Sequence, residues 1–156
     1  MGLLTSPHAM YLLDGASLTK YLSLGLRPVK IPVSTVVAPL YNLAFERSIL
    51  SSIIFDPVQF DDFEAVLTPE DFYLAAHQEI YRSMLTLAHR DLPIDEEFVK
   101  KELTGRQKFD ERVMVDVLTA NPISNTTAYV QEIKDKAMKR HLLTLTTEIK
   151  RVTMSE

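Results

Sequence analysis

The chain has 156 residues, of which 46% are hydrophobic and 24% are charged, a balance typical of a globular protein with a buried core. Its formal net charge of −4 argues against a protein whose main task is to grip the backbone of nucleic acids. The absence of cysteine excludes disulfides, cysteine-ligated zinc, iron–sulfur clusters and a thiol nucleophile.

No apolar run approaches the roughly 18 residues that a membrane-spanning helix needs. The first basic residue is Lys20, whereas a secretory signal places positive charge before its apolar stretch. We therefore expect a cytoplasmic protein that does not associate with membranes.

Glycine and proline are concentrated at the start of the chain. Three of the four glycines and four of the eight prolines lie in residues 1–40, which predicts an irregular N-terminal arm. A short helix could begin near Asp14, and the β-branched residues and proline of 29–33 favour an extended chain. We expect this arm to be partly extended or derived from an expression vector. It would dock on its own domain or on a neighbouring subunit.

From residue 42 onward the pattern is that of helices. Asn42 can cap a helix in which Phe45, Ile49 and Ile53 recur every four positions. Asp56 is followed by Pro57, which predicts a short helix that continues to Leu67.

A capping residue followed by proline occurs again at residues 68–71, where Thr68 and Asp71 have the spacing of a capping box. A further helix is predicted from about Ala75 to His89, and the residues Leu92-Pro93-Ile94 end it.

Two more helices are predicted between residue 95 and the turn at residues 121–125. Asp95 caps a helix that runs to about Leu103, with Gly105 just past its end. Asp110 opens the next helix. After the turn at residues 121–125, nothing interrupts a helix from about Thr126 to Thr153.

This last helix would be over ~40 Å long, which is more than a compact domain about 30 Å across can cover. Its second half carries an apolar stripe, spaced four, three, four and three residues apart, which consists of Met138, Leu142, Leu145, Ile149 and Val152. Such spacing suits a partner helix. Two interpretations stay open at this point: the stripe packs on the chain's own domain, or it meets another chain or a helix that follows.

The last helix is also mildly basic, because it carries Lys134, Lys136, Lys139, Arg140, Lys150 and Arg151. We interpret these side chains as solvated surface rather than as contacts to phosphate.

Motifs that carry chemistry are absent from the sequence. No glycine-rich loop for phosphate is present, and His8, His77, His89 and His141 lack partners at the spacing of a zinc site. Acidic residues lie near predicted helix starts, where they complement helix dipoles: Asp61, Asp62, Glu64, Glu70 and Asp71. Composition and motifs alone therefore indicate a helical interaction domain without a catalytic, metal or cofactor site.

A series of short motifs runs through residues 39–150 in a fixed order. It begins with PLYNLAFERSIL at 39–50 and continues through DFY at 71–73, His77, IY at 80–81, PID at 93–95 and AY at 128–129. In this series the chain resembles the N-terminal domain of DnaB-type replicative DNA helicases. It departs from the family pattern at Ala44, where the family often has glutamate, and at Ser51, where it often has glycine.

The resemblance implies an all-α fold: a compact multi-helix globular head followed by a long helix that is the first half of a helical hairpin. The domains would be an N-terminal arm at 1–40, the head at 41–122 and the long helix at 123–156. The second hairpin helix would follow Glu156.

The resemblance also implies a non-catalytic role. Hairpins pair two heads, three pairs form a collar on the hexameric ring, and the collar binds primase while loader proteins engage the ring. DNA would be contacted only through the full-length ring. ATP and magnesium belong to an ATPase domain that is missing here, so no cofactor and no enzymatic activity are expected of this chain.

We expect the stripe residues to make the subunit contact. The positions that match the family motifs are interpreted as mainly structural, with Phe72, Tyr73, His77, Ile80 and Tyr81 mostly in the core and Asp71 capping. The full set of motif positions is Asn42, Glu46, Leu50, Asp71, Phe72, Tyr73, His77, Ile80, Tyr81, Pro93 and Asp95.

Two alternatives remain beside this interpretation. One is the helicase-binding C-terminal domain of a bacterial primase, whose fold is similar. The other is an unrelated helical protein-interaction or regulatory module, or a small nucleic-acid binder. Its signature would be an affinity for DNA that falls steeply with salt, and the acidic balance of the chain argues against it.

Overall fold

The structure is a computed structural model that describes residues 9–10, 25, 31–32 and 38–155. The chain divides into two compact units, Met1–Ala38 and Pro39–Glu156. In the first unit, strands β1 (Ala9–Met10) and β2 (Ile31–Pro32) pair antiparallel, with Ala9 opposite Pro32. The extended conformation expected at 29–33 is thus confirmed for Ile31 and Pro32. The helix expected near Asp14 lies outside the described residues.

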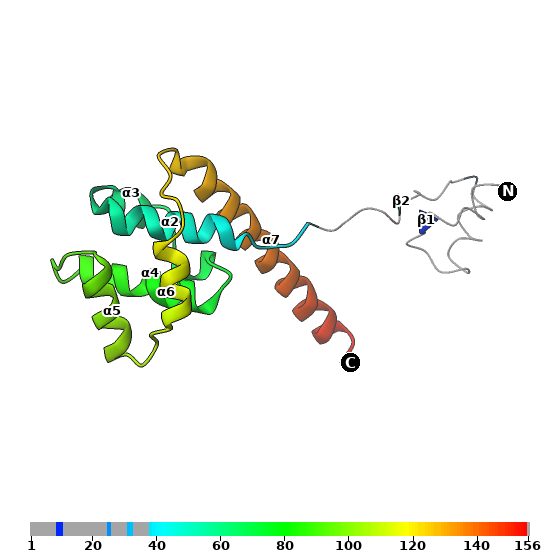
Figure 1. The fold of residues 1–156 in the computed structure, drawn as a ribbon. Coiled ribbons are helices and arrows are strands. Elements are labelled where there is room, and N and C mark those ends of the chain that lie inside the picture. Colours follow the sequence, from blue (N-terminus) through cyan, green and yellow to red (C-terminus); the bar gives the residue numbers. More distant parts are fainter. Residues whose placement is uncertain (1–8, 11–24, 26–30, 33–37, 156) are drawn as a thin grey trace. The chain divides into compact units, whose positions relative to one another are not determined.

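All regular elements in the described part of the second unit are helical, which confirms the predicted all-α class (Figure 1). In chain order they are α2 (Leu43–Phe55), the 3₁₀ turn η1 (Pro57–Gln59), α3 (Phe60–Glu64), the 3₁₀ turn η2 (Pro69–Asp71), α4 (Ala75–Ala88), α5 (Glu96–Gly105), α6 (Glu111–Leu118) and α7 (Thr126–Thr153).

Side-chain caps set the starts of three helices where the sequence predicts them. The Asn42 side chain accepts a hydrogen bond from the Phe45 amide at 3.2 Å, and Asp95 accepts one from the Phe98 amide at 2.9 Å. Asp110 accepts from two amides in the first turn of α6. Each cap satisfies donors that a helix N-terminus otherwise leaves unpaired.

Two predicted boundaries are wrong. The helix expected from Asp56 to Leu67 is split into η1 and α3, and α3 ends at Glu64. Gly105 is the last residue of α5 instead of the residue past its end. Gln107 takes the left-handed conformation (φ 57°), and the amide of Lys108 donates back to the Leu103 carbonyl, so the helix closes with a Schellman motif two residues later than predicted.

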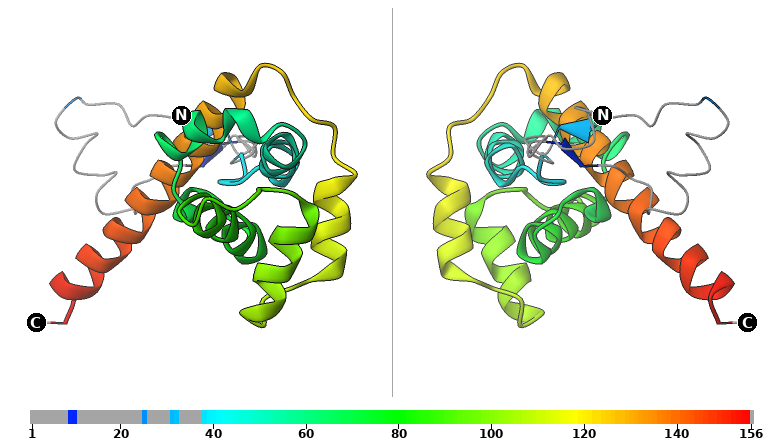
Figure 2. Two further views of the ribbon diagram at one scale, coloured as in Figure 1. Left: turned by 90° about the vertical axis from the view of Figure 1, so that its left-hand side faces the viewer. Right: turned by 90° about the vertical axis from the view of Figure 1, so that its right-hand side faces the viewer.

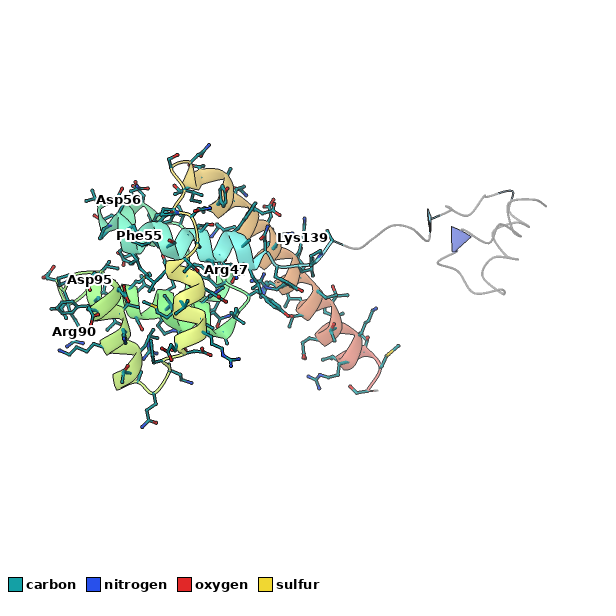
Figure 3. The ribbon with its side chains drawn as sticks, in the orientation of Figure 1. Arg47, Phe55, Asp56, Arg90, Asp95 and Lys139 are labelled. Carbon is teal, nitrogen blue, oxygen red and sulfur yellow. The ribbon has the colours of Figure 1, made fainter. Side chains whose placement is uncertain are left out.

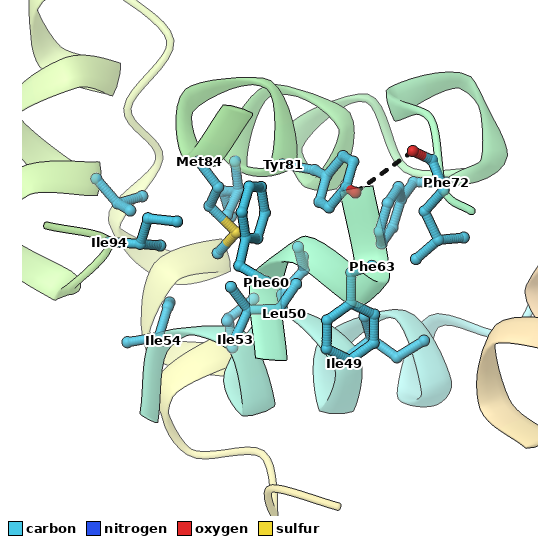
Figure 4. Close-up of a cluster of buried hydrophobic side chains, with 14 of the residues drawn as sticks. Ile49, Leu50, Ile53, Ile54, Phe60, Phe63, Phe72, Tyr81, Met84 and Ile94 are labelled. Atoms are coloured by element: carbon cyan, nitrogen blue, oxygen red, sulfur yellow. Dashed lines mark hydrogen bonds between the residues drawn. The ribbon is translucent and has the colours of Figure 1, made fainter. Parts of the chain in front are cut away.

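The core of the head lies around α2, which packs against α4, α6 and α7. Figure 4 shows the buried side chains that α2, α3 and α4 contribute to it. The side chains of Ile49, Leu50 and Ile53 from α2 are fully buried, as are Tyr81 and Met84 from α4. This packing makes α2 the central element of the head, and α7 lies against it.

Two adjacent serines of α2 fix the loop that precedes α7. The Ser51 hydroxyl donates to the Ala120 carbonyl at 3.0 Å. The Ser52 hydroxyl donates to the Ser48 carbonyl and accepts from the Ile123 amide, both at 2.8 Å. Because both serines are buried, these bonds determine where the chain turns to begin α7.

Tyr81 gives the head a specific response to alkaline pH. Its side chain is fully buried and its hydroxyl donates to the Leu67 carbonyl at 3.4 Å (Figure 4). Burial raises the pKa of the phenol well above its usual value, and the carboxylates of Glu64 and Asp71 raise it further.

We therefore expect the free energy of unfolding to fall above about pH 10, by up to about 1.4 kcal/mol per pH unit, because the phenol ionises first in the unfolded chain. Urea denaturation of the wild type and of Tyr81→Phe from pH 8 to 11 measures the difference. The variant should lack this part of the decline, and parallel curves would contradict the assignment.

Candidate subunit interface on the long helix

A buried carboxylate connects α2 to the start of α4. Glu46 is 1% exposed, and its oxygens accept hydrogen bonds from the Tyr73 amide at 2.8 Å and the Leu74 amide at 3.5 Å. The Nδ1 atom of His77 lies 2.8 Å from the same carboxylate. Glu46 thus caps the N-terminus of α4 from another helix, where a negative charge is stabilised by the helix dipole.

This glutamate–histidine pair is structural. Both side chains are almost completely buried, so a substrate cannot reach them. Their hydrogen bonds go to each other and to the backbone that leads into α4. Among the described residues, no group of three or more histidine, aspartate or glutamate side chains could hold a metal ion.

The motif residues at 71–73 lie in three different environments. The Asp71 carboxylate accepts from the Thr68 amide at 2.8 Å and completes a capping box at η2. Phe72 is fully buried, whereas Tyr73 is 48% exposed. The interpretation of Tyr73 as a core residue is therefore wrong, because its ring stacks on Tyr41 at a centroid distance of 4.4 Å on the surface of the head.

The remaining motif positions are placed as follows. Leu50, Ile80 and Tyr81 are buried in the core, while Asn42 and Asp95 cap helices. Pro93 lies exposed in the loop between α4 and α5.

The first half of α7 packs on the head through one face. Ile133 is buried, and the Tyr129 ring lies 4.3 Å from the ring of Phe45. On the same face, the Lys136 ammonium donates to the Pro39 carbonyl at 3.0 Å. The guanidinium of Arg140 donates to the carbonyls of Leu40 and Asp71 at 2.8 and 2.7 Å.

These contacts correct the interpretation of the basic side chains on α7. Lys136 and Arg140 bind backbone carbonyls of the head instead of lying in solvent, and Lys134 donates to the Val66 carbonyl at 2.6 Å. Lys139 and Lys150 are exposed as expected. The spacing of Tyr129, Ile133, Lys136 and Arg140 places them on one face of α7, but this spacing alone does not separate a basic residue that binds the head from a solvated one.

The second half of α7 extends beyond the head, as Figure 2 shows from two sides. Every residue from 141 to 155 is exposed. The five stripe residues are exposed by 44 to 64%: Met138, Leu142, Leu145, Ile149 and Val152. The described head does not cover the stripe, so the described residues do not support the interpretation in which the stripe packs on the chain's own domain.

Two grooves continue the line of the stripe toward the start of α7. One, of about 460 Å³, lies between η2 and α7 and includes Met138, His141 and Glu70 in its lining. The other, of about 640 Å³, lies between α3 and the first turns of α7. Gln131 and Lys134 line both, so the two hollows are continuous with each other along the first half of α7 and meet the stripe at Met138.

The described helices include none that is long and apolar enough to cross a membrane.

Comparisons with known proteins agree on one family. Residues 38–135 match the family model described as the DnaB-like helicase N-terminal domain. The replicative DNA helicase DnaB of Helicobacter pylori (strain J99) is 35% identical over 105 residues, which cover 67% of this chain and 22% of that helicase.

Two solved structures are similar to the chain. The N-terminal domain of DnaB helicase from Helicobacter pylori, described with its interactions with primase, has a TM-score of 0.68 and 32% identity, covering 71% of this chain and 90% of that one. The corresponding domain from Mycobacterium tuberculosis has a TM-score of 0.69 and 27% identity, covering 76% of this chain and 88% of that one. These matches confirm the resemblance drawn from the motifs, and the matched region is the non-catalytic part of the helicase.

Proposed function

The chain belongs to the family of DnaB-like helicase N-terminal domains, and from this premise we propose that it pairs subunits of a replicative helicase ring and binds primase or loader proteins. In this proposal the chain performs no catalysis and uses no cofactor. ATP-dependent unwinding of DNA, and contacts with DNA, belong to the complete helicase. The matched segment covers only 22% of the Helicobacter pylori helicase. The proposed location is the cytoplasm, where bacterial chromosomes are replicated.

The observation that carries the pairing role is the stripe. Five large apolar side chains lie on one face of a helix that extends away from the head, all at least 44% exposed. Apolar side chains with this heptad-like spacing are typically buried against a facing helix. The family match ends at residue 135, so the support for pairing comes from the structure of α7 itself.

The support for primase binding is indirect. The similar domain from Helicobacter pylori is described with its interactions with primase, and the fold of this chain resembles it over 71% of the chain. Loader binding rests on the resemblance to the helicase family alone.

Sedimentation equilibrium tests the pairing role. We expect the chain to self-associate at high concentration, and Leu142→Asp to weaken association at least about tenfold, since burial of one leucine contributes about 1.5–3 kcal/mol. A charged aspartate in the interface adds a desolvation penalty.

Thr147→Asp is the matched control, because it introduces the same charge in the same part of the helix. Thr147 is exposed on the side of α7 opposite the stripe. A chain that stays monomeric at every concentration, or that loses association equally in both variants, would contradict the pairing role. Binding of the purified chain to primase, measured separately, tests the partner role.

A further inference from the structure

We propose that Arg140 is the positioning residue that fixes the direction in which the outer half of α7 extends from the head. The proposal rests on the proposed function only in one respect: the outer half of α7 is taken as the pairing surface. Its structural basis is independent of whether two chains associate.

Arg140 joins two segments that are far apart in the sequence. Nη1 donates to the carbonyl of Leu40, which precedes α2, and Nη2 donates to the carbonyl of Asp71 in η2, at 2.8 and 2.7 Å. A third and longer contact of 3.5 Å joins Nη2 to the Glu70 carbonyl. A guanidinium holds its donors in a rigid planar fork. Contacts in two directions therefore restrict the rotation of α7 relative to the head as well as the distance between them.

Aromatic rings hold the guanidinium in this orientation. Its central carbon lies 5.6 Å from the centroid of the Tyr73 ring, and Tyr73 is stacked on Tyr41 with an angle of 15° between the rings. Arginine favours this arrangement over an aromatic face. On the surface of the head Tyr73 thus contacts Tyr41 and Arg140, although it contributes little to the core.

Arg140 is also the last residue of α7 that binds the head. Lys136 binds one turn earlier, and all the residues after Arg140 up to residue 155 are exposed. Without Arg140, the last hydrogen bond from α7 to the head comes from the flexible side chain of Lys136. The stretch from Arg140 to Val152 then acts as a lever of about 18 Å, for which a tilt of about 15° moves the end by about 5 Å.

The consequence concerns the geometry of the pair. The stripe begins at Met138 and lies almost entirely on the lever, so the direction of the lever sets the angle between two paired heads. Arg140 thus acts on the assembly through the direction of α7, while its guanidinium stays bound to the head.

Distances between spin labels test the proposal directly. The chain has no cysteine, so Glu97→Cys on α5 and Lys150→Cys on α7 introduce two unique labels at exposed positions outside the stripe. The doubly labelled chain is diluted into excess unlabelled chain, so that only distances within one chain contribute. We expect one narrow distribution for the parent chain, and a distribution that broadens or shifts by about 5 Å in Arg140→Ala.

Lys139→Ala is the control, because Lys139, which is labelled in Figure 3, is exposed and precedes Arg140 in the chain. Arg140→Lys keeps the charge without the fork and should give an intermediate distribution. Far-ultraviolet circular dichroism checks that each variant is folded, and Arg140→Lys decides the question if Arg140→Ala does not fold.

An unchanged distribution in Arg140→Ala and Arg140→Lys, or an equal change in Lys139→Ala, would overturn the proposal. The labels report geometry within one chain, whereas sedimentation reports association. A monomeric chain whose distribution still responds to Arg140 would therefore refute the pairing role alone.

Discussion

Glu46→Ala is expected to lower the free energy of unfolding by about 3–5 kcal/mol. The substitution removes the acceptor for the amides of Tyr73 and Leu74 and for the ring of His77. Leaving the buried His77 ring and two partly buried amides without an acceptor is among the most destabilising changes available to a small domain. Urea denaturation at neutral pH measures the loss.

Two further substitutions make this result specific. Glu46→Gln keeps the shape and one acceptor oxygen, so it should destabilise less than alanine. Glu132→Ala removes a half-exposed glutamate that pairs with Lys136 at 3.1 Å, and should change stability by less than about 1 kcal/mol. A loss below about 1 kcal/mol for Glu46→Ala would show that the buried network does not stabilise the start of α4.

Phe72→Ala should lower the free energy of unfolding by about 3–5 kcal/mol, because it leaves a cavity in the centre of the core. The Phe72 side chain is fully buried and its ring lies 5.0 Å from that of Tyr81. The neighbouring residue supplies the matched control. Tyr73 is 48% exposed, so Tyr73→Ala should lower stability by about 1 kcal/mol through the lost stack on Tyr41.

Equal losses in the two variants would contradict the assignment of Phe72 to the core and Tyr73 to the surface. The two substitutions are adjacent in the chain and remove similar rings, so differences in the unfolded state largely cancel. Thermal unfolding followed by circular dichroism supplies a second measurement of the same contrast.

The sequence was sufficient to predict most helix starts, because the signals at those positions are local. Asn42, Asp95 and Asp110 each bond to amides two or three residues further on, so their effect is visible in a short window. The apolar stripe of α7 was predicted for the same reason, since helical periodicity is a property of one segment. The ends of helices were less predictable, because Gln107 adopts a left-handed conformation that usually favours glycine.

The residues that the sequence did not reveal depend on distant partners. Arg140 binds carbonyls 100 and 69 residues away, and a solvated basic residue has the same local pattern. Tyr73 follows the buried Phe72 in a family motif and was expected in the core, but its ring lies on the surface, stacked on Tyr41, 32 positions earlier. Glu46 was assigned a structural role from the family motif alone, and only the fold identifies the three donors around it.

The central claim is that the stripe on the outer half of α7 is a pairing surface between chains. Methyl resonances recorded by NMR over a dilution series test it without any substitution. We expect the methyl signals of Leu142, Leu145 and Ile149 to shift or broaden as concentration rises, while those of Val58 and Val115, which are 89% and 51% exposed on the head, stay unchanged. Stripe signals that do not respond to concentration, or head signals that respond in their place, would contradict the account.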